Sequence, residues 1–149
     1  MTTAEYLSQI SRFEDMIERK QNEILKLDSL AHGIKSPTYD PDKVQTSMRG
    51  DKMGTIVVKL MENQEELQDL IETFIDKRKT IVSQIDRIPN QISYKVLTDR
   101  YIGLKRYYEI ASELQYSEKW VRKAHARALK EFEELYGSEY LDKELEYLC

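Results

Sequence analysis

The sequence has very little cysteine and histidine, which limits the chemistry open to it. Among its 149 residues one is cysteine, Cys149, and two are histidine, His32 and His125. A single thiol forms no internal disulfide, and one cysteine with two histidines is too few to suggest a metal cluster. The sequence also has no phosphate loop of the form G-x-x-x-x-G-K-[ST] and suggests no Ser–His or Cys–His pair. We therefore predict a protein that is not an enzyme and uses no metal or cofactor.

Proline, glycine and long apolar runs are scarce as well. Three Pro and five Gly in a chain with 34% charged residues are typical of long helices with solvated faces, and argue against a β-sandwich. No apolar run approaches the roughly 20 residues of a membrane-spanning helix. The first residues, MTTAEYLSQISRFED, lack the layout of a signal peptide. These features predict an all-α, cytoplasmic protein without membrane contact.

The net charge of −4 is unevenly distributed. Residues 1–88 carry 13 basic and 16 acidic groups, residues 89–136 carry 9 and 7, and residues 137–149 carry 1 and 4. Affinity for nucleic acid must therefore come from a local face, and the acidic end of the chain should oppose non-specific binding.

Two heptad patterns occupy residues 1–88. After a cap at Thr2 or Thr3, apolar residues recur four and three apart until Gly33, with Lys20 as the exception: Tyr6, Ile10, Phe13, Ile17, Ile24, Leu27 and Ala31. The second pattern begins at Asp51, with Gln64 and Arg78 as polar interruptions: Met53, Val57, Leu60, Leu67, Ile71, Phe74, Ile81, Ile85 and Ile88. Residues 33–50 follow neither period and are expected to form a loop, either a flexible connector or an ordered loop that presents Arg49 and Lys52 to a partner.

Two helices with narrow apolar stripes must bury those stripes. We expect residues 1–88 to form a long antiparallel, coiled-coil-like helical hairpin. Because two helices leave each stripe partly uncovered, a second copy is the expected partner, which predicts a homo-oligomer, most simply a dimer. The polar residues on the stripes either set the register or lie at an edge where their heads reach water.

Residues 89–136 predict a small domain of three helices. The first begins near Asn90 or Gln91, ends at Gly103 and places four residues in the core: Ile92, Val96, Leu97 and Tyr101. Residues 107–132, YYEIASELQYSEKWVRKAHARALKEF, form two amphipathic helices with a break at Gln115 and Tyr116, and Ser117 caps the second. Two helices, a tight turn and a basic second helix are the parts of a helix-turn-helix. Residues 137–149 are expected to be an acidic tail, or one more short helix through Tyr140, Leu141, Leu145 and Leu148.

The second of these helices has no acidic residue from Lys119 to Lys130. An ordinary amphipathic helix can carry such cations, and basic residues near a C-terminus suit the helix dipole. Here the cations begin in the N-terminal turn, where the dipole disfavours them, and no acidic residue interrupts the run from Lys119 to Lys130. We therefore prefer DNA binding as the explanation.

The pattern EIASEL…S…V…A..RAL resembles region four of bacterial sigma factors, the part that reads the promoter −35 element. The resemblance covers residues 97–135. The chain resembles more closely the short sigma-like regulators of Gram-positive phages and prophages, the RinA/ArpU type of late-gene activators. The stretch VQTSMRGDKM at residues 44–53 is also similar to these regulators. That family usually has Gly at the turn, where this chain has Gln115. By position, the resemblance implies base contacts at Glu118, Lys119, Arg122 and Lys123.

The resulting prediction is a phage or prophage transcriptional regulator that activates late genes and has double-stranded DNA as its partner. The hairpin is expected to dimerise or to contact RNA polymerase. Arg122 and Lys123 are expected at base edges, with other contacts at the groove entrance, the turn and phosphate: Lys105, Arg106, Tyr116, Ser117, Glu118, Lys119, Trp120, Arg127 and Lys130. Two alternatives remain, a small terminase-type DNA-packaging protein that assembles as a ring, and a coiled-coil adaptor without DNA binding.

Overall fold

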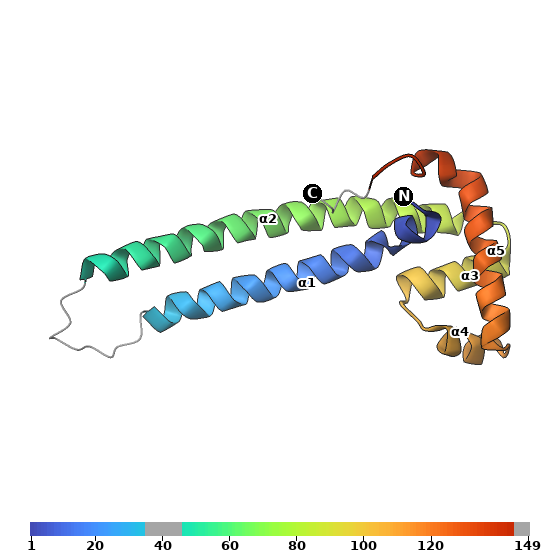
Figure 1. Ribbon diagram of the computed structural model, residues 1–149, viewed down its shortest axis with the longest axis horizontal. Helices are drawn as coiled ribbons and strands as arrows, with labels where there is room; N and C mark the ends of the chain where they lie inside the picture. The colour runs from blue at the N-terminus through green and yellow to red at the C-terminus, as the bar shows by residue number, and fades with distance from the viewer. Residues whose placement is uncertain (35–45, 145–149) are drawn as a thin grey trace. The chain divides into compact units, whose positions relative to one another are not determined.

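Every regular element that the structure describes is helical, which confirms the predicted all-α class. The computed structural model describes residues 1–34 and 46–144, with the side chains of 1–33 and 51–144. In chain order the elements are α1 (Thr3–Ile34), α2 (Thr46–Asp86), α3 (Gln91–Leu97), a π-helical turn (Thr98–Ile102), α4 (Tyr107–Leu114), α5 (Glu118–Tyr136) and a 3₁₀ turn (Gly137–Glu139) (Figure 1). Contacts divide the chain into two compact units. The core unit comprises Met1–Phe13 and Phe74–Cys149, and the hairpin unit comprises Glu14–Thr73.

The first helix is capped by Thr2, one of the two residues predicted for this position. The Thr2 hydroxyl accepts a hydrogen bond from the Glu5 N–H at 3.1 Å, and the Glu5 carboxylate accepts one from the Thr2 N–H at 2.7 Å. This reciprocal pair is a capping box, which satisfies two N–H groups that have no partner inside the helix. The hydrogen bond from Thr2 also lowers the pKa of Glu5 below its usual value.

The second helix begins earlier than its heptads indicate. The sequence predicted a loop over residues 33–50 and a helix from Asp51, but α1 continues to Ile34 and α2 begins at Thr46. The prediction was wrong at residues 46–50 because helical geometry extends beyond the apolar stripe that revealed the helix. The remainder of the expected loop, residues 35–45, lies outside the described residues.

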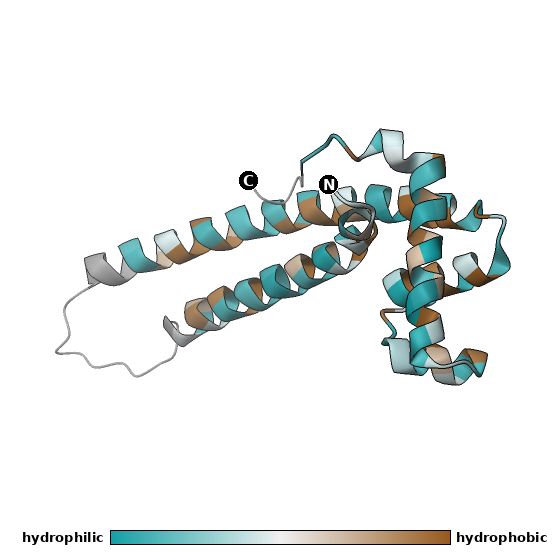
Figure 2. Ribbon diagram, turned by 45° about the vertical axis from the view of Figure 1, so that its right-hand side comes forward, coloured by the Kyte–Doolittle hydropathy of each residue, from teal (hydrophilic) through white to brown (hydrophobic). Residues whose placement is uncertain are grey.

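Within the hairpin unit, the segments of α1 and α2 run antiparallel. The Lys20 ammonium forms an ion pair with Glu66 and donates a hydrogen bond to the Asn63 amide oxygen at 3.1 Å, so this polar seam residue is paired rather than stranded. Apolar and polar residues alternate along both helices (Figure 2). The inward register of α2 differs from the prediction at two positions. Ile56 and Asn63 are half-buried where Val57 and Gln64 were expected, and Val57 and Gln64 are exposed.

The main hydrophobic cluster of the core unit joins the N-terminal turns of α1 to the end of α2 and to α5. Its buried members are Leu7, Ile10, Ile81, Ile85, Ile88, Leu97, Tyr101, Ala128, Phe132 and Tyr140. The side chain of Arg78, a predicted seam position of α2, is exposed, while that of Lys77 is half-buried. The segment expected to be a separate domain, residues 89–136, therefore shares its largest core with both ends of the predicted hairpin.

The third helix begins at a side-chain cap and ends in a widened turn. The Asn90 side chain accepts hydrogen bonds from the N–H groups of Ile92 and Ser93 at 2.9 and 3.3 Å. Ser93 is buried, whereas Ile92, which was expected in the core, is 44% exposed. After Leu97 the chain forms the π-helical turn, closed by a hydrogen bond from the Gly103 N–H to the Thr98 carbonyl at 2.9 Å. This extra residue per turn places Tyr101 in the core.

Residues 137–140 belong to the core unit instead of forming a solvated tail. The Tyr140 side chain is 1% exposed, stacks on Tyr6 with ring centroids 4.2 Å apart, and its hydroxyl lies 2.7 Å from the Thr3 hydroxyl. Thr3 in turn donates a hydrogen bond to the Glu133 carboxylate at 2.9 Å. A short helix was the alternative expectation, through Tyr140, Leu141, Leu145 and Leu148. The chain forms a turn at Tyr140 and Leu141, and Leu145 and Leu148 lie outside the described residues.

Candidate nucleic-acid interface

The turn between α4 and α5 is built without glycine. Gln115 takes the left-handed conformation, with φ 60° and ψ 39°, that Gly adopts most easily. The Tyr116 N–H donates to the Ala111 carbonyl at 3.0 Å and the Gln115 N–H to the Ser112 carbonyl at 3.4 Å. These two bonds form a Schellman motif, which satisfies the last carbonyls of α4. The tight turn therefore forms with a non-glycine residue under local strain.

The predicted cap of α5 is present. Ser117 is extended, with φ −76° and ψ 156°, and its hydroxyl accepts a hydrogen bond from the Trp120 N–H at 3.1 Å. Just before this cap, Tyr116 stacks on the Trp120 ring at 3.8 Å between centroids and an interplanar angle of 13°. Tyr116 is exposed and Trp120 is half-buried, so an aromatic pair lies at the N-terminal end of the helix.

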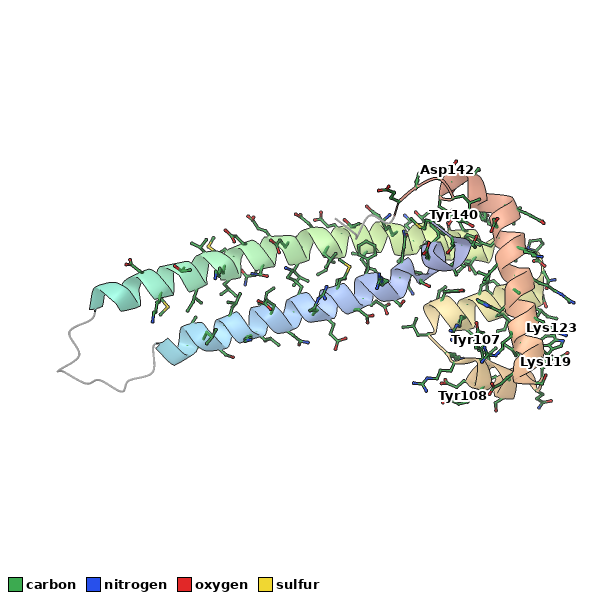
Figure 3. The ribbon with its side chains drawn as sticks, in the orientation of Figure 1. Tyr107, Tyr108, Lys119, Lys123, Tyr140 and Asp142 are labelled. Carbon is green, nitrogen blue, oxygen red and sulfur yellow. The ribbon has the colours of Figure 1, made fainter. Side chains whose placement is uncertain are left out.

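The two faces of α5 differ sharply in chemistry. One face is buried and consists of Val121, Ala124, Ala128 and Phe132. The other is exposed and carries the five cations of the acid-free run together with Ala126, and we call it the basic face of α5: Lys119, Arg122, Lys123, Ala126, Arg127 and Lys130. Lys119 and Lys123 lie one turn apart along the helix, with Tyr107 and Tyr108 on the neighbouring α4 (Figure 3). Ala126 contributes almost no bulk, so a partner can approach the helix closely there.

Tyr107 contacts two guanidinium groups at the edge of the basic face. The Arg122 guanidinium carbon lies 4.6 Å from the centroid of the Tyr107 ring, and that of Arg100 lies 4.3 Å away. Both distances are those of cation–π contacts. Arg100 also donates a hydrogen bond to the Lys105 carbonyl at 3.1 Å, whereas Arg122 has no hydrogen bond or ion pair to any of the described residues. The hydrogen-bonding edge of Arg122 is therefore available to a partner.

His125 links Tyr101 and Tyr107 beneath this edge. Its Nε2 lies 2.7 Å from the Tyr101 hydroxyl and its Nδ1 lies 3.2 Å from the Tyr107 hydroxyl. Burial, assisted by the nearby charge of Arg100, lowers the pKa of His125 to about 4, and burial raises the pKa of Tyr101 to about 12. His125 is consequently neutral at neutral pH and adds no charge to the basic face.

Lys105 differs from the other cations predicted to contact a partner. Its ammonium lies 2.9 Å from both carboxylate oxygens of Glu113 and 3.6 Å from the carboxylate of Asp99, and the bond to Glu113 raises the pKa of Lys105 above its usual value. Two carboxylates thus offset its charge. Arg106 is exposed at the N-cap of α4, and Glu118 is exposed in the first turn of α5. The structure therefore brings together Tyr116–Lys130 and leaves Lys105 in an internal ion-pair cluster.

Sequence reasoning missed the aromatic and cationic group around Tyr107. The apolar spacing of Tyr107 and Ile110 predicts a core position for Tyr107, and no pattern in the sequence indicates a role for Arg100. The spacing of Tyr107 and Ile110 on one apolar stripe gave no sign that the Tyr107 ring also contacts two arginines. The π-helical turn positions Arg100, and helical periodicity in the sequence does not reveal such a turn.

Two further features are absent from residues 1–34 and 46–144. None of the helices there is long and apolar enough to cross a membrane. Within the same residues, no group of three or more His, Cys, Asp or Glu side chains is arranged to hold a metal ion.

Comparison with known proteins identifies the family of this chain. No curated protein and no solved structure matched the chain. One family model matched residues 33–133, which is more than half of the chain and includes α2, α3, α4 and most of α5. The chain therefore belongs to the family described as a protein of unknown function, DUF1492.

Proposed function

We propose that this protein binds double-stranded DNA through the basic face of α5 and acts as a transcriptional regulator of phage or prophage genes. The observation that carries the proposal is the exposed, acid-free cationic face on the second helix of a helix-turn-helix. A helix of this kind fits the major groove, where arginine and lysine read guanine and flanking cations contact phosphate. The resemblance to sigma region four supplies the regulatory part of the proposal, and with it RNA polymerase as a partner.

The position of each cation on α5 suggests a division of roles. Arg122, Lys119 and Lys123 lie in the first half of the helix, as expected for residues that reach base edges. Arg127 and Lys130 follow one to two turns later and suit phosphate. Beyond Lys130 the helix carries Glu131, Glu133 and Glu134, which would repel phosphate. The proposed contact region therefore ends near Lys130.

The experiment is a selection of bound duplexes from a random pool with the full chain, followed by binding measurements over a range of salt concentrations. Arg122→Ala should cost about 1–3 kcal/mol on the selected sequence and relax the preference at one or two base pairs. Arg127→Ala should weaken binding to all sequences alike and reduce the salt slope by roughly one. Lys26→Ala, which removes an exposed cation from α1, is the matched control and should change neither property.

If Arg122→Ala and Lys123→Ala together leave the affinity for every duplex unchanged, α5 is not a recognition helix and the proposal fails. Light scattering on the same protein separates the regulator from the packaging alternative. A monomer or dimer agrees with a regulator, whereas a ring-sized assembly would favour a small terminase-type protein.

A further inference from the structure

The hairpin unit does not bury a core of its own. Among residues 14–33 and 51–73, where side chains are described, none is buried. Even the inward seam residues stay half-exposed, including Ile24 on α1 and Leu60 on α2. Two helices cannot surround an apolar stripe, and helices of this kind are stable in water chiefly through packing against further surface. The hairpin unit therefore has unused capacity to bind another element.

A second apolar stripe on α2 lies fully at the surface. Gly54, Val58 and Met61 follow one another at spacings of four and three, which places them on one face of the helix. Val58 is 53% exposed and Met61 is 61% exposed. We call these three residues the outer stripe of α2. Their spacing is that of a seam onto which one more helix packs.

Gly54 is the least expected member of this stripe. A glycine inside a helix costs about 1 kcal/mol relative to alanine. Apart from its chain neighbours and the nearby backbone of its own helix, no described atom lies within 4 Å of the place where a Cβ would be, so no packing contact among the described residues requires a glycine there. A missing side chain on an exposed helical face allows a second backbone to approach closely. Together with Val58 and Met61, it makes a shallow site for a helix.

The charge beside the outer stripe determines which kind of helix fits. Lys52 and Lys59 lie on the same turns as Gly54 and Val58, but from Leu60 to Thr73 α2 carries no basic residue and five carboxylates, which begin next to Met61: Glu62, Glu65, Glu66, Asp69 and Glu72. Of these five carboxylates, Glu66 is the one that pairs with Lys20 in the described contacts. Two copies of the chain meeting along this stretch would place like charges together, which is costly across an interface. Charge complementarity therefore favours a basic partner over the second copy that the heptads alone suggested.

We propose that the outer stripe of α2 is a docking site for an amphipathic helix of another protein, with an apolar seam flanked by lysine or arginine. Met61 and Val58 pack against the apolar seam, Gly54 admits the partner backbone, and Glu62 and Glu65 face its cations. This surface lies in the hairpin unit and makes no use of α5, so the site is independent of the proposed DNA binding.

The test uses two synthetic helical peptides about three heptads long, identical in their leucine seam, with lysine on both flanks in one and glutamate in the other. Binding to the full chain is measured by fluorescence anisotropy. The lysine peptide should bind at least roughly tenfold more tightly than the glutamate peptide, and added salt should reduce the difference. Equal binding of the two peptides would overturn the proposal.

Three variants locate the site. Val58→Ser with Met61→Ser should weaken the lysine peptide by roughly tenfold or more, because the apolar contact is lost. Gly54→Leu should also weaken it, although leucine favours the helix more than glycine does, so the loss cannot come from unfolding. Leu25→Ser, at an exposed apolar position of α1, is the matched control and should bind normally. If Gly54→Leu binds as the wild type does, the outer stripe is not the docking site.

Light scattering on the full chain decides between a foreign helix and a second copy. A monomer at micromolar concentration agrees with the proposal. A dimer that dissociates on Val58→Ser with Met61→Ser would show that the outer stripe binds another copy of this chain, and would overturn it.

Discussion

At the scale of single residues, the arrangement around Tyr107 gives Arg122 two separate surfaces. Its guanidinium face lies over the Tyr107 ring at 4.6 Å, while its N–H donors have no partner among the described residues. A face held by an aromatic ring restricts the side chain to fewer rotamers and leaves the planar fork free for bidentate recognition. In the proposed complex, Tyr107 is thus a positioning residue that acts through Arg122.

This arrangement predicts a difference between two substitutions of Tyr107. Tyr107→Leu removes the ring and should reduce affinity for the selected duplex by about 0.5–1 kcal/mol, the usual strength of an exposed cation–π contact. Tyr107→Phe keeps the ring and should bind nearly as the wild type does, although it loses the contact with His125. Binding isotherms on the selected duplex measure both variants. Equal affinity of the two variants would show that the ring does not position Arg122.

The buried imidazole of His125 predicts a pH dependence of stability. Because its folded pKa is about 4, below the ordinary value of about 6.5, the unfolded chain binds a proton more readily. The stability from neutral His125 is therefore fully present above pH 6.5 and is lost as the pH falls toward 4. The unfolding free energy of the wild type should fall between pH 7 and pH 4.5. In His125→Gln this fall should be smaller by about 1–2 kcal/mol, a range that allows for partial exposure of the ring.

Urea unfolding of both proteins across that pH range provides the measurement. The carboxylates titrate in the variant as in the wild type, so the difference between the two curves isolates His125. Parallel curves would mean that the imidazole is not shielded as the structure indicates.

At the scale of elements, the turn between α4 and α5 holds its central residue, Gln115, in a backbone conformation that glutamine rarely adopts. Gln115 holds a positive φ of 60° because the Schellman hydrogen bonds and the packing of α4 on α5 require a left-handed residue there. The cost of this conformation lowers the stability of the helix-turn-helix without altering its geometry.

Replacing Gln115 by glycine should therefore stabilise the protein. The expected gain in unfolding free energy is about 0.5–1 kcal/mol, with unchanged DNA preference. The matched control is Gln64→Gly, at an exposed and regular helical position of α2, which should instead cost about 1 kcal/mol. Thermal unfolding of the two variants checks both signs. A destabilised Gln115→Gly protein would show that the glutamine side chain contributes a contact of its own.

At the scale of the whole molecule, the helix-turn-helix depends on residues far away in the sequence. Its local cluster consists of Ile110, Ala111 and Val121, whereas Leu97, Ala128 and Phe132 pack in a second cluster with the beginning of α1, the end of α2 and Tyr140. A core of three buried residues is too small to hold three helices alone. The core unit is therefore expected to unfold cooperatively, together with the beginning of α1 and Tyr140.

Tyr140 tests this dependence. Tyr140→Ala should cost about 3–5 kcal/mol, because it removes a fully buried aromatic ring from the main cluster. Tyr140→Phe should cost only about 1 kcal/mol, the value of the hydrogen bond with Thr3. Tyr108→Ala is the control, since Tyr108 is 53% exposed and should change stability by less than about 0.5 kcal/mol. Urea unfolding gives all three values, and a mild Tyr140→Ala would mean that residues after α5 do not support the core.

Much of the architecture follows from local patterns in the sequence alone. The heptads of α1, the cap at Ser117 and the acid-free run from Lys119 to Lys130 are properties of neighbours three or four residues apart, and these are the distances that helical geometry makes predictable. The same patterns predicted the all-α class and the amphipathic character of α5. They also identified the candidate cations, because charge and spacing are visible without coordinates.

Only the tertiary structure decided which of those residues act together. It paired Lys20 with Asn63, placed Lys105 near two carboxylates, packed Arg122 on Tyr107 and brought Tyr140 into the core. The hydrogen bonds among these contacts join residues that are 8 to 137 positions apart in the sequence. The inward register of α2 was likewise decided by packing, since Ile56 and Val57 fit the apolar period equally well. Local periodicity specifies which face of a helix is apolar, but the partner that covers it is set by contacts between distant segments.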